Sequence, residues 1–168
     1  MNIRILTEDD AQSYQNVRLR ALQTNPEAFG STYEREVNFS LEIVKERIAP
    51  TQDNFVLGAF DDQSSLIGIV IFMRESSVKM RHKANVYAMY VTPENRGKGV
   101  SKLLMAELIR MAKSCDDLEQ LNLAVVSENK AAKKLYKSLG FVVYGVERNA
   151  LKFNGRYYDE DLMVLRLL

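Results

Sequence analysis

The chain has 168 residues, of which 46% are hydrophobic and 27% are charged, a composition typical of one compact globular domain. Its 23 basic and 22 acidic side chains leave a formal net charge of +1, which excludes binding to nucleic acid or an anionic membrane through bulk charge. One cysteine and one histidine provide neither an internal disulfide nor a structural zinc site, so no metal is expected.

The chain shows no internal boundary and no targeting segment. No linker rich in Pro, Gly or Ser interrupts it, so residues 1–168 are expected to form a single domain. The first residues lack the apolar core of a signal peptide, and the longest unbroken apolar run, Ile69–Met73, is far too short to span a membrane. We therefore expect a cytoplasmic protein without a membrane or nucleic-acid partner.

The first third of the chain is expected to be mainly helical after a short strand over Asn2–Leu6. Thr7, followed by an acidic residue three positions later, fits a capping box at the start of a helix, and Asn25-Pro26 ends that helix. Ser40 is a second N-cap candidate, and the helix that it begins ends at Pro50.

Strands follow from residue 55. Two apolar runs, Phe55–Phe60 and Leu66–Met73, are joined by a five-residue polar loop and predict a β-hairpin. A third strand is expected over Ala84–Val91. Strict alternation along it places three residues on one face: Val86, Ala88 and Tyr90.

The last part of the chain alternates helices with strands. The clearest amphipathic helix begins at Val100, and its apolar stripe is Val100, Leu103, Leu104, Leu108, Met111 and Ala112. The later elements are a strand over Leu121–Val126, a helix over Ala131–Leu139, and strands over Phe141–Val146 and Leu162–Leu168. Together these predict an α/β (α+β) fold with a mixed, mostly antiparallel sheet of about seven strands and helices on both faces.

A loop with two glycines connects the third strand to the amphipathic helix. Its sequence is Arg96-Gly97-Lys98-Gly99-Val100-Ser101. Glycines at this spacing let backbone N–H groups converge on an anion at the positive end of a helix, so the loop is suited to phosphate. It matches neither the P-loop nor the dinucleotide-binding motif. A connector without a ligand is the alternative interpretation.

A second motif lies about thirty residues further along, and the two motifs together resemble a known family. Asn129 is an N-cap candidate, Tyr136 follows a core position of the helix, and Gly140 lies at its C-terminal end. From about Leu66 onward, the chain closely resembles the GNAT superfamily of acetyl-CoA-dependent N-acetyltransferases. It departs from the family where Ser101 replaces the usual Gly or Ala, a small side chain that the loop tolerates but that is expected to narrow the approach of the pyrophosphate.

The resemblance implies how acetyl-CoA is bound. The N–H groups from Arg96 through Ser101, and as far as Lys102, would bind the pyrophosphate, the strand edge at Met89–Val91 would pair with the pantetheine amides, and Asn129 would hold the pantetheine arm. Lys130, Lys133 and Lys134 stand where a 3′-phosphate would lie, although a solvated helix face is the alternative. The implied cofactor-binding residues are Met89, Tyr90, Val91, Arg96, Gly97, Lys98, Gly99, Val100, Ser101, Lys102, Asn129 and Lys133.

The resemblance also implies a catalytic acid. The hydroxyl of Tyr136 would protonate the departing CoA thiolate, with a purely structural core tyrosine as the alternative. An amine attacks a thioester without a protein nucleophile, so Cys115 has no expected role.

The sequence offers several candidates for the general base. An alkylammonium must lose a proton before it attacks, and the glutamate that some family members carry on the strand before the loop is replaced here by Ala88-Met89-Tyr90. The candidates, each also readable as a surface residue, are Glu34, Glu36, His82, Asp159 and Glu160.

The sequence thus predicts an N-acetyltransferase that moves acetyl from acetyl-CoA to a primary amine by direct attack in a ternary complex. Acidic residues near aromatics, at 27–36 and 157–161, favour a cationic amine, although ordinary surface acid explains them equally well. The alternatives are a protein lysine or N-terminal acetyltransferase, a non-catalytic acyl-CoA sensor and, more remotely, a nucleotide-binding regulatory domain. A homodimer through the apolar residues 164–168 also stays open.

Overall fold

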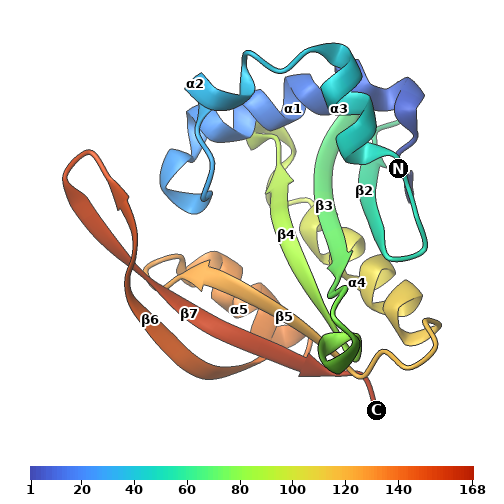
Figure 1. The fold of residues 1–168 in the computed structure, drawn as a ribbon. Coiled ribbons are helices and arrows are strands. Elements are labelled where there is room, and N and C mark those ends of the chain that lie inside the picture. The colour runs from blue at the N-terminus through green and yellow to red at the C-terminus, as the bar shows by residue number, and fades with distance from the viewer.

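A seven-stranded sheet runs through the computed structural model, which describes residues 1–168 (Figure 1). Its strand order is β1-β2-β3-β4-β5-β7-β6, and every neighbouring pair is antiparallel except β4 and β5, which are parallel. The strands are β1 (Asn2–Ile5), β2 (Asn54–Phe60), β3 (Leu66–Arg74), β4 (Lys83–Val91), β5 (Gln120–Val126), β6 (Val142–Phe153) and β7 (Arg156–Arg166). The predicted fold class is confirmed.

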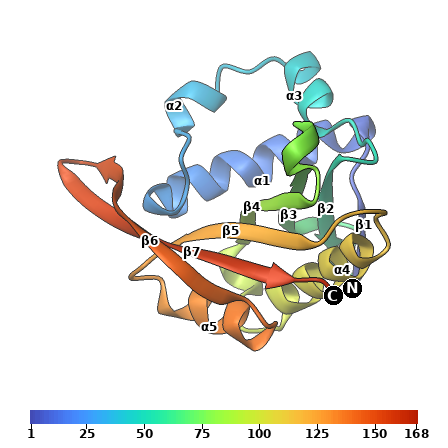
Figure 2. The same cartoon turned by 60° about the horizontal axis from the view of Figure 1, so that its bottom comes forward.

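Helices cover both faces of the sheet, with α1 and α3 on one side and α4 and α5 on the other (Figure 2). The helices are α1 (Ala11–Thr24), α2 (Tyr33–Glu36), α3 (Leu41–Ile48), α4 (Val100–Lys113) and α5 (Lys130–Ser138), with short 3-10 turns at Glu8–Asp10, Pro26–Ala28, Val78–Met80 and Pro93–Asn95. Ser40 caps α3 by accepting the Ile43 N–H at 3.3 Å, as the sequence predicts. None of these helices is both long and apolar enough to cross a lipid bilayer.

Each face has its own apolar core. The larger core joins the sheet to α4 and α5 and includes Leu104, Leu108 and Phe72, each 0% exposed. The smaller core joins it to α1 and α3 through residues such as Tyr14 and Ile48. Burying a side chain of this size contributes about 1.5–3 kcal/mol, so the two cores hold the helices against the sheet. Leu103, expected in the apolar stripe of α4, is 48% exposed, so the stripe is narrower than predicted.

A β-bulge interrupts β4 and corrects the predicted alternation. Ile69 and Ile71 of β3 face Tyr90 and Tyr87 of β4, so β4 carries one extra residue there, and Ala88 has φ +54°. The extra residue reverses which face the following side chains occupy. Val86 therefore belongs to the core beneath α4, and Tyr90 belongs to the core beneath α1; the prediction that they share a face is wrong.

Strands β4 and β5 pair only at one end. Residues 83–85 of β4 pair with residues 120–122 of β5, and beyond them the strands separate (Figure 1). We call this region the fork; it comprises Val86–Val91 of β4 and Leu123–Val126 of β5. Within the fork β4 has β3 on one side and no strand on the other, although it is central in the strand order.

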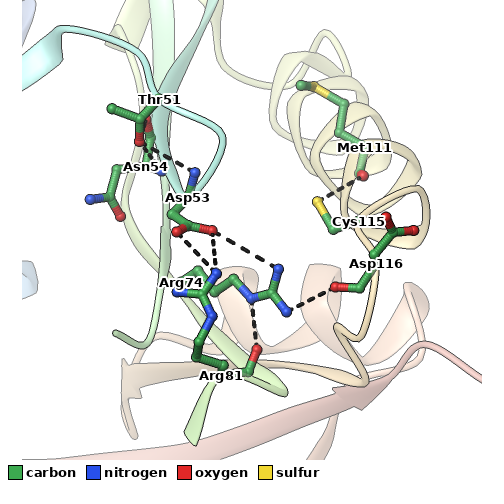
Figure 3. A network of polar contacts seen from close by, with 8 residues as sticks. All are labelled: Thr51, Asp53, Asn54, Arg74, Arg81, Met111, Cys115 and Asp116. Carbon is green, nitrogen blue, oxygen red and sulfur yellow. Dashed lines mark hydrogen bonds and ion pairs between the residues drawn. The ribbon is translucent and has the colours of Figure 1, made fainter. Parts of the chain in front are cut away.

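A polar network lies at the paired end of these strands (Figure 3). Arg74, whose side chain is 9% exposed, donates from Nε to the Arg81 carbonyl at 2.7 Å and from Nη2 to the Asp116 carbonyl at 2.9 Å. Arg81 pairs with Asp53 at 3.1 Å. The network ties β3 to the loops before β2, β4 and β5. Cys115 lies beside it and donates from Sγ to the Met111 carbonyl at 3.5 Å.

The hairpin of β6 and β7 is much longer than predicted. The sequence suggested strands over 141–146 and 162–168, whereas the strands extend over 142–153 and 156–166. They are joined by a tight turn at Asn154-Gly155, where both residues have positive φ. The additional residues are mostly polar and exposed, so they lack the apolar run from which strands are inferred.

Candidate active site

The glycine loop, Arg96–Gly99, leads from β4 into α4 and leaves a run of backbone donors free. No N–H group from Gly97 through Lys102 donates a hydrogen bond within the protein, and the first bond of the helix runs from Leu103 N–H to the Gly99 carbonyl at 3.1 Å. The N–H of Arg96 donates to the Pro93 carbonyl at 3.3 Å. The donors available to an anion therefore begin at Gly97, one residue later than the sequence suggested.

Glycine is favoured at positions 97 and 99 by the left-handed backbone conformation, and not by a lack of space for a side chain. Gly97 has φ +75° and Gly99 has φ +79°, and a Cβ built on either would meet no atom within 4 Å. Gly99 is also the N-cap of α4 and provides no capping side chain. The positive end of α4 is thus left open to a ligand, whereas Ser40 and Asn129 close the N-termini of α3 and α5.

Side chains of the glycine loop and of the 3-10 turn before it attach this segment to α1 and its C-cap residue. Arg96 donates from Nε to the Val91 carbonyl at 3.0 Å and from Nη2 to Asn25 Oδ1 at 2.8 Å. Glu94 is held by Arg20 at 2.7 and 2.8 Å, and the hydrogen bonds from Arg20 lower the pKa of Glu94 to about 2. The Arg96 guanidinium is therefore occupied in fixing the loop. Lys98 extends only to Asn95 Oδ1, at 3.4 Å.

Met89, Tyr90 and Val91 lie on β4 within the fork. Tyr90 points toward α1, where its hydroxyl lies 3.0 Å from Thr24 Oγ1 and its ring lies under the Arg96 guanidinium at 5.4 Å. Met89 packs against the core on the α4 side. Since no strand pairs with this edge of β4, its backbone is available to an extended ligand.

Asn129 and Tyr136 lie across the fork, on or next to α5. Asn129 Oδ1 accepts the Ala132 N–H at 3.1 Å, whereas its side-chain NH₂ has no partner in the chain and is free to donate to a ligand. Tyr136 is 7% exposed, its ring packs edge-on against Phe141 at 5.9 Å, and its hydroxyl makes no hydrogen bond within the protein. Burial raises the pKa of Tyr136 to about 12, so the phenol keeps its proton at neutral pH.

Lys133 is engaged within the protein, which does not fit its predicted role in binding CoA. Its Nζ lies 2.7 Å from Asp161 Oδ2 and donates to the Ser127 carbonyl at 3.2 Å, and Ser127 Oγ donates to Asp161 at 2.5 Å. This ammonium is neutralised inside the protein and does not stand free for a 3′-phosphate. Lys130 and Lys134 are exposed and unpaired, so they are better placed for that role. The sequence could not reveal the Asp161 contact, because it joins residues far apart in the chain.

Three candidate bases are placed where they cannot easily act. Glu36 is 0% exposed; burial alone would raise its pKa, but Arg18 at 2.8 Å and Arg47 at 3.1 Å outweigh this and hold the pKa below its ordinary value. Asp159 accepts the Asn149 N–H and an Arg148 N–H, which lower its pKa. His82 precedes β4 at its paired end, outside the fork.

Glu160 and Glu34 remain candidates. Asp161 pairs with Lys133 of α5, so strand alternation places its neighbour Glu160 on the opposite face of β7. Figure 2 shows α1 on the side of the sheet opposite α5. Glu160 is half-buried, directly opposite Glu147 on β6 and beside Val126 of the fork; burial, and then the charge of Glu147, raise its pKa. Neither glutamate has a basic partner.

A cavity of about 330 Å³ lies between the end of α1, the segment 26–34 and the tip of β6. We call it the α1–β6 cavity. Its lining residues are Leu22, Gln23, Pro26, Glu27, Phe29, Gly30, Ser31, Thr32, Tyr33, Glu34, Leu151, Lys152 and Phe153. The three residues from β6 lie beyond the strand end that the sequence predicts, so the sequence analysis did not identify them. The dipeptide Asn154-Gly155, a strong signal for a hairpin turn, would have located them.

Comparisons with known proteins point to one family. The family model described as "Acetyltransferase (GNAT) domain" matches residues 3–162. A spermidine N(1)-acetyltransferase of Vibrio cholerae is 30% identical over 62% of this chain and 59% of the relative, so the chain spans about three fifths of that relative's length. An L-amino acid N-acetyltransferase of Escherichia coli is 26% identical over 86% of this chain and 88% of the relative.

The fold has close counterparts among solved structures. A Salmonella typhimurium structure, described as an acetyltransferase with its cofactor acetyl-CoA, has a TM-score of 0.81 and 24% identity, covering 100% of this chain and 94% of that one. At this identity the likeness establishes the fold alone.

Proposed function

This chain belongs to the GNAT acetyltransferase family, and we propose that it transfers an acetyl group from acetyl-CoA to the primary amine of a small molecule. The observation that carries the proposal is the unpaired run of N–H groups from Gly97 through Lys102, next to the unpaired edge of β4. One element suits a pyrophosphate and the other an extended amide chain, and CoA contains both in sequence.

The residues around the fork fit acetyl-CoA. The N–H groups from Gly97 through Lys102 would hold the pyrophosphate, Met89–Val91 would pair with the pantetheine amides, and the free NH₂ of Asn129 would donate to the pantetheine arm. When bound, acetyl-CoA supplies the acetyl group as a thioester. The N–H of Ser101 donates no hydrogen bond within the protein, so it counts among the available donors.

Two residues would handle protons. Glu160 fits a proton acceptor for the reacting ammonium, because it is half-buried, has a raised pKa and lies beside the fork. Tyr136, which keeps its proton at neutral pH, would protonate the sulfur as the C–S bond breaks and the new C–N bond forms. Overall, a protonated amine and acetyl-CoA give the amide, free CoA thiol and one proton.

The acceptor is proposed to be a small amine. The acceptor would bind in the α1–β6 cavity, which is bordered on one side by the segment 26–34 and on the other by the β6 tip and so suits a compact molecule. The relatives act on small amines by name, spermidine in one case and an L-amino acid in the other.

The test is free-thiol release from acetyl-CoA with a panel of diamines, amino acids, monoamines and a lysine peptide. We expect thiol release that requires both protein and a small amine, with intersecting lines in a two-substrate analysis. Parallel lines would indicate a covalent acetyl-enzyme and contradict direct attack. Tight CoA binding without turnover on any amine would favour the non-catalytic sensor, and turnover only on the peptide would favour a protein acceptor.

A further inference from the structure

The two sides of the fork would bind different parts of one acetyl-CoA molecule. We call Val86–Val91 together with the glycine loop the β4 limb, and Leu123–Val126 together with Asn129 and α5 the β5 limb. In the proposed function the β4 limb holds the pyrophosphate and the pantetheine amides, while Asn129 and Tyr136 act from the β5 limb. The separation of the two limbs must therefore match the ligand.

That separation is set at a short base. Strands β4 and β5 pair only over residues 83–85 and 120–122, and the His82 carbonyl accepts two more N–H groups from the start of β5 and the residue before it, at 2.8 and 3.2 Å. At about 3.3 Å per residue, the part of β4 within the fork extends about 20 Å beyond this base, so a rotation of about 5° at the base moves its far end by about 2 Å. A displacement of that size exceeds the range of hydrogen-bond lengths and would separate a bound ligand from one of the limbs.

Arg74, the last residue of β3, bridges the segments that enter the two limbs (Figure 3). Its Nε donates to the Arg81 carbonyl at 2.7 Å, just before β4, and its Nη2 donates to the Asp116 carbonyl at 2.9 Å, in the loop before β5. Its own backbone N–H donates to the Asp53 carbonyl at 2.8 Å. One planar guanidinium thus holds the entry to β4 and the entry to β5 at a fixed distance from each other.

The bridge depends on Arg74 alone. Its side chain is 9% exposed, so water competes little for its N–H groups. Neither the Arg81 carbonyl nor the Asp116 carbonyl accepts a backbone N–H, so each relies on the guanidinium. The carboxylate of Asp53 lies 3.9 Å from Nη1, further away than either carbonyl. The charge of Arg74 is therefore directed at the backbone at the base of the fork.

We propose that Arg74 is a positioning residue for acetyl transfer, because it fixes the separation of the β4 limb and the β5 limb before CoA arrives. This inference rests on the proposed function and adds a residue that contacts neither substrate. Without the bridge, the ligand must itself bring the limbs to the correct separation, and affinity is lost to that ordering.

The first test compares a ligand that spans the fork with one that does not. The change is Arg74→Lys, which keeps the charge but replaces the planar fork of donors with one flexible ammonium. We expect the Kd for CoA, measured by calorimetry, to rise about tenfold, and kcat/KM to fall about 10²-fold, as a misplacement of about 1 Å produces. ADP has the pyrophosphate but no pantetheine arm, so it contacts the β4 limb alone, and its Kd should change by less than about twofold.

Arg81→Gln is the matched control. It removes the ion pair of Arg81 with Asp53 at 3.1 Å in the same network, but it keeps the backbone carbonyl to which Arg74 donates. CoA affinity should stay unchanged in this variant. An equal loss in Arg81→Gln, an equal loss for ADP and CoA in Arg74→Lys, or unchanged CoA affinity in Arg74→Lys would overturn the proposal. If Arg74→Lys does not fold by urea titration, Arg74→Gln, which keeps a shorter donor, takes its place.

The second test measures the separation of the limbs without any ligand. Spin labels are attached at Ala106→Cys on α4 and Lys137→Cys on α5, both exposed positions, with Cys115→Ser removing the native thiol. We expect a narrow distribution of label distances with Arg74 in place, a broader one in Arg74→Lys, and a return toward the narrow one when CoA is added. Distributions of equal width in the two ligand-free proteins would refute the bridge.

The two tests separate this inference from the proposed function. Failure of the unmutated protein to bind CoA or to release thiol would refute the proposed function, and the label distances would then decide alone whether Arg74 fixes the fork. Normal CoA binding and turnover in both the unmutated protein and Arg74→Lys would leave the proposed function standing and refute the role of Arg74.

Discussion

Replacing Gly99 by alanine tests the phosphate-binding role of the glycine loop. Gly99 has φ +79° and ψ 8°, and a Cβ there meets no atom within 4 Å, so the change introduces no clash. It places an alanine in the left-handed backbone region, which costs about 1–2 kcal/mol in conformational energy. The loop relieves that strain by changing φ, and this turns neighbouring N–H groups away from their common target. We expect the Kd for CoA, measured by calorimetry, to rise about tenfold or more, equivalent to about 1.4 kcal/mol.

Gly155→Ala provides the matched control. Gly155 has φ +75°, and its Cβ would also meet nothing within 4 Å, but it lies in the β6–β7 turn. The same backbone strain should lower the free energy of unfolding in urea while leaving CoA affinity unchanged. Unaltered CoA binding by Gly99→Ala would refute the phosphate role. An equal loss of affinity in Gly155→Ala would attribute the effect to general destabilisation.

Tyr136→Phe keeps the buried ring and removes the acid, so kcat should fall by about 10²–10⁴-fold with CoA affinity nearly intact; loss of affinity together with kcat would indicate a packing role. Glu36→Gln leaves buried arginine charge unpaired and should lower the free energy of unfolding in urea by about 3–5 kcal/mol, whereas Glu94→Gln, in an exposed pair with Arg20, should change it little. Because the folded-state pKa of Glu36 lies below 4.5, its contribution is complete above that pH and is lost as pH falls through the folded value. Acid titration of stability should therefore show a shallower loss in Glu36→Gln than in the unmutated protein.

The glycine loop and α4 were readable from the sequence because local rules determine them. Two glycines two residues apart, followed by apolar residues at helical spacing, encode both the left-handed turn and the buried stripe. Ser40 and Asn129 were recognisable as N-caps for the same reason, since the bond that each makes reaches only three residues along the chain.

Features that depend on contacts between residues distant in the chain could not be predicted from the sequence. The bulge at Ala88 leaves no mark on the alternating pattern of β4, because residues on both sides of it are apolar and both faces of the sheet are covered. Glu36 and Lys133 looked like surface charges because their partners, Arg18 and Asp161, lie 18 and 28 residues away in sequence. Charge roles in a folded site depend on such partners, which composition and spacing do not specify.

The separation of β4 from β5 also bears on how the protein behaves without its ligand. From Val86 to Val91, a strand in the middle of the sheet has no strand on one side, and its backbone groups on that side, apart from the Val91 carbonyl that accepts from Arg96, are open to any extended chain, as those of an outer strand are. A pantetheine arm in that position would block self-association as well as bring in the acetyl group. We therefore expect the ligand-free protein to be the form most prone to aggregate, and the solubility of the chain to rise with CoA occupancy.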